Sequence, residues 1–310
     1  MRDRLRNMMV YVLLAAIVAI VPIGIARHML AESRSDAFLD DKPNYLAHLY
    51  PPRGKAELSQ KLAGLLDANL QQMNEVPRIY LSRLPEVLPT LYDAREKKRM
   101  FTSSMLPIIL RANELIIADR SRLLVILHKL DEDETLGKSE QKWLKQTAKQ
   151  YRVRLGETPA ASDINNLLYK IDVVPVSLAL AQAAMESGWG TSKFAQRGNA
   201  LFGEWVWGDN AIGIIPSGRD EGKTHKIKSF DYLLDSVRSY MTNLNRHKSY
   251  EDLRRRRAEL REHSLAVTGA ALAPALVDYS ERGTEYVNDI LSIISYNDLG
   301  ALDHALLGSS

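Results

Sequence analysis

The stretch DVVPVSLALAQAAMESGWGTSKFAQRGNALFG, residues 172–203, decides the fold. Pro175 stands where a helix can begin, and the residues from Val176 to Ser187 are apolar on nearly every face. A helix that lacks a polar face belongs inside a domain. Gly188 and Gly190 follow, and glycine is the residue that most often ends a helix. The sequence therefore predicts a buried helix over 176–187 that ends in a glycine turn.

One carboxylate, Glu186, lies at the C-terminal end of this predicted helix. Apolar neighbours and the negative end of the helix dipole both disfavour its charge, so both raise its pKa. A carboxyl group with a raised pKa can keep a proton near neutral pH, as a general acid must. Small neighbouring residues leave space beside it, and Trp189 offers an aromatic wall suited to a sugar. The alternative is an ion-paired glutamate at a frayed helix end.

The run AQAAMESGWGTSKFA followed by GNALFG resembles the signature of bacterial peptidoglycan glucosaminidases, the Bax-like branch of glycoside hydrolase family seventy-three. The resemblance covers about residues 171–301, and the run at 76–81 resembles the N-terminal extension of the same group. It implies a mainly α, lysozyme-like catalytic domain with a small β-hairpin beside a cleft. In that family, the glutamate that matches Glu186 donates the proton to the glycosidic oxygen. The family's usual Asn-Asn is Asn199-Ala200 here.

The residues after this signature predict the hairpin. Glu204 to Trp207 is strand-like, residues 208–210 have turn chemistry, 211–215 can pair next, and 223–230 alternate as a half-exposed strand. The resemblance implies a second acidic residue on the hairpin, for which Asp220 and Glu221 are candidates and Glu204 is a third. The alternative for Asp220 and Glu221 is a solvated turn. Trp205 and Trp207 are either sugar-stacking platforms or hairpin core, and we expect one of them in the core.

Two tyrosines complete the predicted site. The segment 276–294 resembles the family's Tyr-Ala-Thr-Asp-Pro-X-Tyr segment, in which Tyr279 matches the tyrosine that reaches the cleft and Tyr286 the second tyrosine. The alternative for Tyr279 is an aromatic residue that packs helices together. The predicted catalytic residues are Glu186, Glu221, Asp220 and Tyr279, and the predicted substrate-binding residues are Trp189, Asn199, Phe202, Trp205 and Tyr286.

Composition excludes several other classes of protein. Of the 310 residues, 25% are charged and 45% hydrophobic, which is typical of a folded chain, and a net charge of +3 is too small to indicate a nucleic-acid partner. Without cysteine there is no disulfide, thiolate zinc site or cysteine nucleophile. The histidines lack zinc-site spacing, and Gly188-Trp189-Gly190 lacks the third glycine of a dinucleotide fingerprint, so neither a metal nor a cofactor is expected. The basic run 254–257 with Arg261 is interleaved with acids, which predicts a solvated helix face.

The N-terminus predicts a membrane location. Three arginines precede the uncharged segment 8–26, which is long enough to span a bilayer. We expect an uncleaved inner-membrane anchor with the body facing the periplasm, and a cleaved signal peptide is the alternative. The predicted division is 1–30 anchor or signal, 31–54 tether, 55–160 helical extension and 161–303 lysozyme-like glucosaminidase domain. Within the extension and the start of the domain, helices are expected over 55–74, 104–130, 139–151 and 161–169.

The resemblance and the chemistry of Glu186 together predict an enzyme. We expect a peptidoglycan hydrolase that cuts the β-1,4 bond after N-acetylglucosamine, with glycan strands of the cell wall as its partner. A lytic transglycosylase would use the same glutamate, with a sugar hydroxyl in place of water. A third possibility is a wall-binding scaffold without activity. The sequence gives residues 55–160 no chemistry and names no protein partner for them.

Overall fold

The computed structural model describes residues 49–50, 70, 75–208, 210–216, 222 and 224–308. The predicted anchor at 1–30 lies outside these residues, as do nearly all of the tether and of the predicted helix at 55–74. Asp220 and Glu221 also lie outside the described residues.

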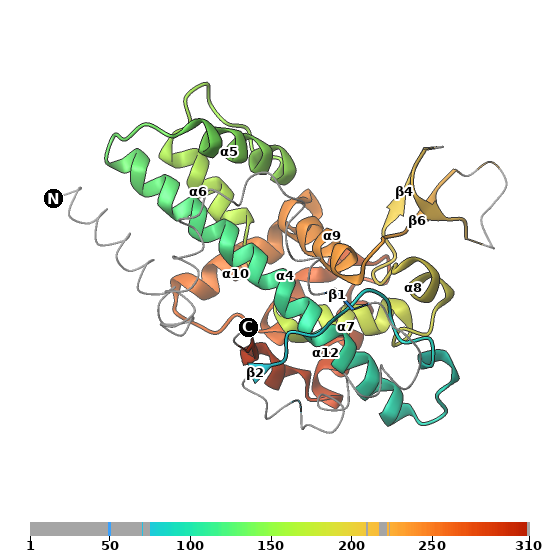
Figure 1. The fold of residues 1–310 in the computed structure, drawn as a ribbon. Coiled ribbons are helices and arrows are strands. Elements are labelled where there is room, and N and C mark those ends of the chain that lie inside the picture. Colours follow the sequence, from blue (N-terminus) through green and yellow to red (C-terminus); the bar gives the residue numbers. More distant parts are fainter. Residues whose placement is uncertain are drawn as a thin grey trace.

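A long helix, α4 (Ala94–Asp131), runs diagonally across the molecule (Figure 1). The sequence pattern placed its start at Ser104, which is wrong, because Asp93 caps the helix earlier by accepting hydrogen bonds from the backbone of Arg95 and Glu96. Pro107 therefore lies inside the helix and not in its first turn. Of the described helices, α4 alone is long and apolar enough to cross a membrane, but 72% of its most apolar window is buried in this domain. It is a core helix.

Shorter helices pack around α4, which contacts α6, α7 and α9. Helix α7 has the predicted bounds, and α5 and α6 begin and end within one residue of prediction. The helices are α5 (Lys138–Tyr151), α6 (Ala161–Lys170), α7 (Val176–Ser187), α8 (Lys193–Gly198), α9 (Leu233–Arg246), α10 (Glu251–Glu262), α11 (Gly269–Leu272) and α12 (Thr284–Tyr296). The short 3₁₀ helices are η4 (Leu88–Thr90), η5 (Lys248–Tyr250), η6 (Ala273–Tyr279) and η7 (Leu299–His304).

The N-terminal helices and the C-terminal region share one hydrophobic core. Buried side chains of α4, α7, α9 and α12 belong to a single cluster. The glycine turn after α7 packs directly against this core: a Cβ on Gly190 would lie 2.9 Å from Leu84 Cδ1 and 2.9 Å from Phe101 Cδ2. At the edge of the core, β2 (Glu75–Val76) pairs in parallel with β7 (Leu306–Leu307), and β1 (Leu49–Tyr50) with β3 (Tyr80–Leu81).

A small antiparallel sheet projects away from the helices (Figure 1). Its strands are β4 (Trp205–Val206), β5 (Gly213–Ile214) and β6 (Lys226–Lys228), in the order β4-β6-β5. Strand β5 was expected to pair next after β4, but both pair with β6. Gly213 explains the difference, because a Cβ there would lie 2.6 Å from the carbonyl oxygen of Ile227. Only glycine allows β5 to approach β6 this closely.

The basic run on α10 is divided between the interior and the surface. Arg254 and Arg257 are each only 1% exposed, so the prediction of a solvated face is wrong for both. Arg255 and Arg256 are exposed and pair with acids on the same helix, as that prediction requires. The two buried guanidinium groups are stable inside because backbone carbonyls accept their hydrogen bonds.

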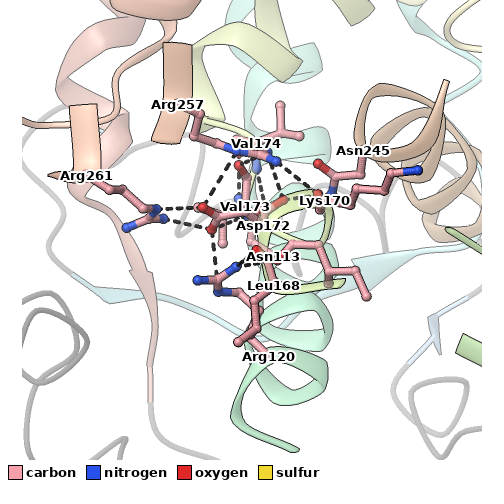
Figure 2. Close-up of polar contacts among 11 residues, drawn as sticks. Asn113, Arg120, Leu168, Lys170, Asp172, Val173, Val174, Asn245, Arg257 and Arg261 are labelled. Carbon is pink, nitrogen blue, oxygen red and sulfur yellow. Dashed lines mark hydrogen bonds and ion pairs between the residues drawn. The ribbon is translucent and has the colours of Figure 1, made fainter. Parts of the chain in front are cut away.

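Arg257 belongs to a buried group that we call the Asp172 cluster, namely Asp172 with Arg120, Arg257 and Arg261 (Figure 2). Arg261 donates two hydrogen bonds to the carboxylate, at 2.6 and 2.8 Å. Arg120 and Arg257 also donate to carbonyl oxygens at and after the C-terminal end of α6, where the helix dipole favours cations. The cluster fixes the segment that leads into α7.

Candidate active site

Helix α7 ends in a turn that holds Glu186 in place. Gly188 (φ +59°) and Trp189 (φ +56°) both adopt the left-handed conformation, and the Trp189 amide donates to Ala184 O at 2.7 Å. The Ser187 hydroxyl accepts a hydrogen bond from the Gly190 amide at 2.8 Å. This is the glycine turn predicted from the sequence, and it leaves Glu186 one residue before the end of the helix.

Glu186 is exposed to solvent, yet neighbouring protein atoms partly desolvate its carboxyl group. Desolvation raises the pKa of Glu186 above its ordinary value of 4.5, and a hydrogen bond from Tyr286 opposes part of that rise. The direction is the one that the apolar sequence around Glu186 predicts. A carboxyl group in this setting can both hold a proton and meet a ligand from solvent.

Four tyrosines from four elements lie within electrostatic reach of Glu186: Tyr240 on α9, Tyr250 on η5, Tyr279 on η6 and Tyr286 on α12. The rings of Tyr279 and Tyr286 stack with centroids 5.2 Å apart, and Tyr250 lies 5.8 Å from Tyr279. Burial raises the pKa of all four hydroxyls, and the negative charge of Glu186 adds to it. All four are therefore neutral hydrogen-bond donors.

Sequence reasoning identified Tyr279 and Tyr286 but missed Tyr240 and Tyr250 as neighbours of Glu186. Tyr240 lies in the apolar stripe of its helix, where a tyrosine is typical of the core, and Tyr250 follows a polar stretch without any motif. Gln182 was also missed, although it lies four residues before Glu186 and thus on the same helix face. That spacing was the one signal in the sequence that could have identified it.

A second carboxylate, Glu204, follows the Leu-Phe-Gly run and is largely buried. Its Oε2 accepts a hydrogen bond from Ser239 Oγ at 2.8 Å and lies 3.6 Å from Lys228 Nζ. The other oxygen, Oε1, is buried without a hydrogen-bond partner among the described residues. The negative charges of Glu204 and Glu186 both raise the pKa of the Tyr250 hydroxyl, so Tyr250 is a neighbour that the two carboxylates share.

The tryptophans of the projecting sheet are both exposed, Trp205 by 54% and Trp207 by 65%. The expectation that one of them forms hairpin core is wrong, because the sheet is too small to bury a ring and no described element covers this face. Trp205 stacks on the His225 ring with centroids 4.5 Å apart. The Trp207 ring meets the Trp205 ring edge-on, with centroids 6.1 Å apart. The pair presents an aromatic surface to solvent.

Three other predicted sugar-binding residues contact protein. Asn199 is completely buried, and its Nδ2 donates to the carbonyl oxygens of Ser82, Phe230 and Asp231 at 3.1–3.2 Å. Phe202 stacks on Tyr240 with centroids 3.9 Å apart. Trp189 packs edge-on against Phe101 at 5.7 Å, with Lys98 Nζ 5.0 Å from its ring centroid. These contacts stabilise the surroundings of Glu186, and a sugar contact for the three stays a prediction.

No metal site is found within the residues that the structure describes, where no three His, Asp or Glu side chains gather closely enough to hold an ion. The chemistry available at this site is that of carboxyl and phenol groups. Such a set can transfer protons and stabilise a cationic centre.

Comparison with known proteins agrees with this chemistry. The family model for mannosyl-glycoprotein endo-beta-N-acetylglucosaminidase matches residues 161–299. Protein bax of Escherichia coli (strain K12) is 32% identical over 201 residues, which cover 65% of this chain and 70% of that protein. The chain belongs to the Bax-like glucosaminidase family. No solved structure matches it.

Membership of this family makes the chain a glycoside hydrolase of the endo-beta-N-acetylglucosaminidase class. The predicted mainly α, lysozyme-like fold is confirmed. The range that the glucosaminidase model matches begins with α6 and contains Glu186, Glu204 and all four tyrosines. The α4 helix lies before that range, although it shares the core of the glucosaminidase domain.

Proposed function

We propose that this glucosaminidase hydrolyses the β-1,4 bond after N-acetylglucosamine in the glycan strands of peptidoglycan, with Glu186 as its general acid. The observation that carries the proposal is the state of Glu186, a solvent-accessible carboxyl group at the end of an apolar helix with a raised pKa. A raised pKa lets the group hold a proton and release it to the glycosidic oxygen as the bond breaks.

The cationic sugar that develops needs a second group. Asp220 and Glu221, which lie between β5 and β6 in the sequence, are the first candidates. Glu204 is the third, with one oxygen unpaired among the described residues and the other bonded to Ser239. The acetamido group of the substrate is the alternative, as in substrate-assisted families. Tyr279, whose hydroxyl is within electrostatic reach of Glu186, is proposed to contact the reacting sugar.

The exposed rings of Trp205 and Trp207 are proposed to hold the glycan strand. Tryptophan rings combine a large apolar face with little conformational freedom, which suits them to the flat face of a pyranose. Since the sheet projects from the helical body, these rings can contact sugars remote from the bond that is cut (Figure 1).

We propose that residues 8–26 anchor the enzyme in the inner membrane, with the glucosaminidase domain in the periplasm, where peptidoglycan lies. The uncharged length of that segment and the arginines before it support this placement. Cell fractionation tests it: full-length protein should remain with the membranes after a high-salt wash. Recovery of a shortened, soluble periplasmic form would show instead that the segment is a cleaved signal.

The test of function is digestion of purified sacculi by the full-length protein in detergent, with wild type, Glu186→Gln and the surface control Glu259→Gln. We expect reducing N-acetylglucosamine ends from wild type and the control, and a rate lower by about 10²-fold or more for Glu186→Gln. Anhydro-muramic ends would identify a lytic transglycosylase. Binding to sacculi without clearance would identify a scaffold, and parental activity of Glu186→Gln would refute the role of Glu186.

A further inference from the structure

A chain of buried hydrogen bonds leads from Glu186 into the domain. Gln182 lies one helical turn before Glu186 on α7 and is fully buried. Its Nε2 donates to the Tyr286 hydroxyl oxygen at 2.8 Å, and its Oε1 accepts from the Tyr240 hydroxyl at 2.5 Å. The Tyr286 hydroxyl in turn bonds to the Glu186 carboxyl group. Both tyrosines are at most 2% exposed, so water does not compete for these groups.

The directions of these bonds determine where protons can lie. An amide nitrogen only donates, so the Tyr286 oxygen is an acceptor toward Gln182 and its own proton is free to point at Glu186. The Tyr240 hydroxyl donates its proton to Gln182 Oε1. This bond prevents a 180° flip of the Gln182 side-chain amide, because the flipped amide would place an NH₂ group, which cannot accept, opposite the Tyr240 proton. The oxygen of Glu186 that faces Tyr286 therefore accepts a hydrogen bond, which makes it the less basic of the two oxygens and favours the proton on the other one.

We propose that Gln182 is a positioning residue that, held by Tyr240, keeps the Tyr286 hydroxyl donating to Glu186 and so places the catalytic proton on the other carboxyl oxygen. This rests on the proposed function of Glu186. That proton passes to the glycosidic oxygen while the bond to the anomeric carbon breaks and its electron pair stays with the leaving oxygen. Glu186 becomes a carboxylate, and the Tyr286 bond strengthens as the charge develops, which stabilises the transition state.

The charge of Glu186 reaches the hydroxyls of Tyr240, Tyr250, Tyr279 and Tyr286 on the packed elements, all four of them neutral, and of these Tyr286 donates a hydrogen bond to it. Loss of the Tyr286 hydroxyl removes a donor to the carboxylate and favours the protonated form. Loss of the Tyr240 hydroxyl leaves Gln182 Oε1 without a donor, so the amide can turn and accept the Tyr286 proton. Glu186 then donates to Tyr286, which again favours its protonated form although Tyr240 makes no hydrogen bond to Glu186.

The experiment measures sacculus clearance against pH at low wall concentration, where the rate follows kcat/KM, for the full-length protein. Activity falls at alkaline pH as Glu186 loses its proton. Tyr286→Phe should move this alkaline limb up by about one pH unit. Tyr240→Phe should move the alkaline limb upward by about half a pH unit. The variant that carries both Tyr240→Phe and Tyr286→Phe should match Tyr286→Phe alone, because Tyr240 acts only through the Tyr286 hydroxyl. Gln182→Met, which conserves volume, should also move the limb upward.

Tyr151→Phe is the matched control. It removes a buried tyrosine hydroxyl that bonds to Thr242 and does not belong to the hydrogen-bond series of Tyr240, Gln182, Tyr286 and Glu186. It should lower the thermal midpoint without moving the limb. An unmoved limb in Tyr240→Phe, or additive shifts in the double variant, would refute the positioning role of Gln182. Failure of the proposed function is a separate result, because it appears as activity in Glu186→Gln.

Discussion

Replacing Asp172 with asparagine should destabilise the domain by about 3 kcal/mol. The carboxylate accepts hydrogen bonds of 2.6 and 2.8 Å from Arg261 and lies 3.6 Å from Arg257 Nε and 3.7 Å from Arg120 Nε. Breaking a buried ion pair on one side costs about 3–5 kcal/mol. The lower figure applies because asparagine keeps one acceptor oxygen and the guanidinium groups of Arg120 and Arg257 keep their backbone acceptors.

The same change should alter the dependence of stability on pH. The three arginines hold the pKa of Asp172 well below its ordinary value. A depressed pKa in the folded state contributes stability above the unfolded pKa of about 3.9, and this contribution is lost as the pH falls further. The free-energy difference between wild type and Asp172→Asn should therefore be full near neutral pH and shrink below about pH 4.

The assay is urea unfolding of the full-length protein, followed by tryptophan fluorescence at a series of pH values. Asp252→Asn is the matched control, because Asp252 pairs with Arg255 at 2.8 Å on the surface and its side chain is 65% exposed. That variant should lose less than about 1 kcal/mol. A loss in Asp172→Asn no larger than in the control, or one that persists unchanged into acid, would refute this reasoning.

Two further predictions concern the glycine turn and the projecting sheet. Gly190→Ala should lower the free energy of unfolding by about 2–4 kcal/mol, because Gly190 has φ +77° and the added methyl would meet Leu84 and Phe101 at 2.9 Å. Thermal denaturation measures this loss. Gly300→Ala is the control, because a Cβ at Gly300 would meet nothing within 4 Å. Trp205→Ala, at a ring 54% exposed, should raise KM for sacculi severalfold with kcat and thermal midpoint unchanged; an unchanged KM would exclude the ring from glycan binding.

The elements that the sequence predicted well are those whose signals are local. Helix α7 has an all-round apolar composition, a proline before it and a glycine after it, and its bounds match. The direction of the Glu186 pKa shift followed from the same apolar neighbours. Local signals misled where two of them competed, as at Ser104, where the apolar stripe hid the earlier cap at Asp93.

What the sequence could not predict depends on contacts between distant segments. The arginines at 254 and 257 are buried because a helix end and Asp172 lie opposite them, and nothing within α10 shows this. Gln182 and Tyr240 are 58 residues apart in the chain, and their hydrogen bond exists only in the folded domain. The strand order of the small sheet likewise depends on the close approach of Gly213 to β6.

The central claim is that Glu186 holds a proton where an ordinary glutamate does not. The most direct measurement is a ¹³C NMR titration of the glutamate carboxyl groups in the full-length protein, with Glu186→Gln to assign the signal. We expect the Glu186 carbon to titrate above the ordinary pKa of 4.5, and higher still in Tyr286→Phe. Titration at or below 4.5 in the wild-type protein would contradict the account.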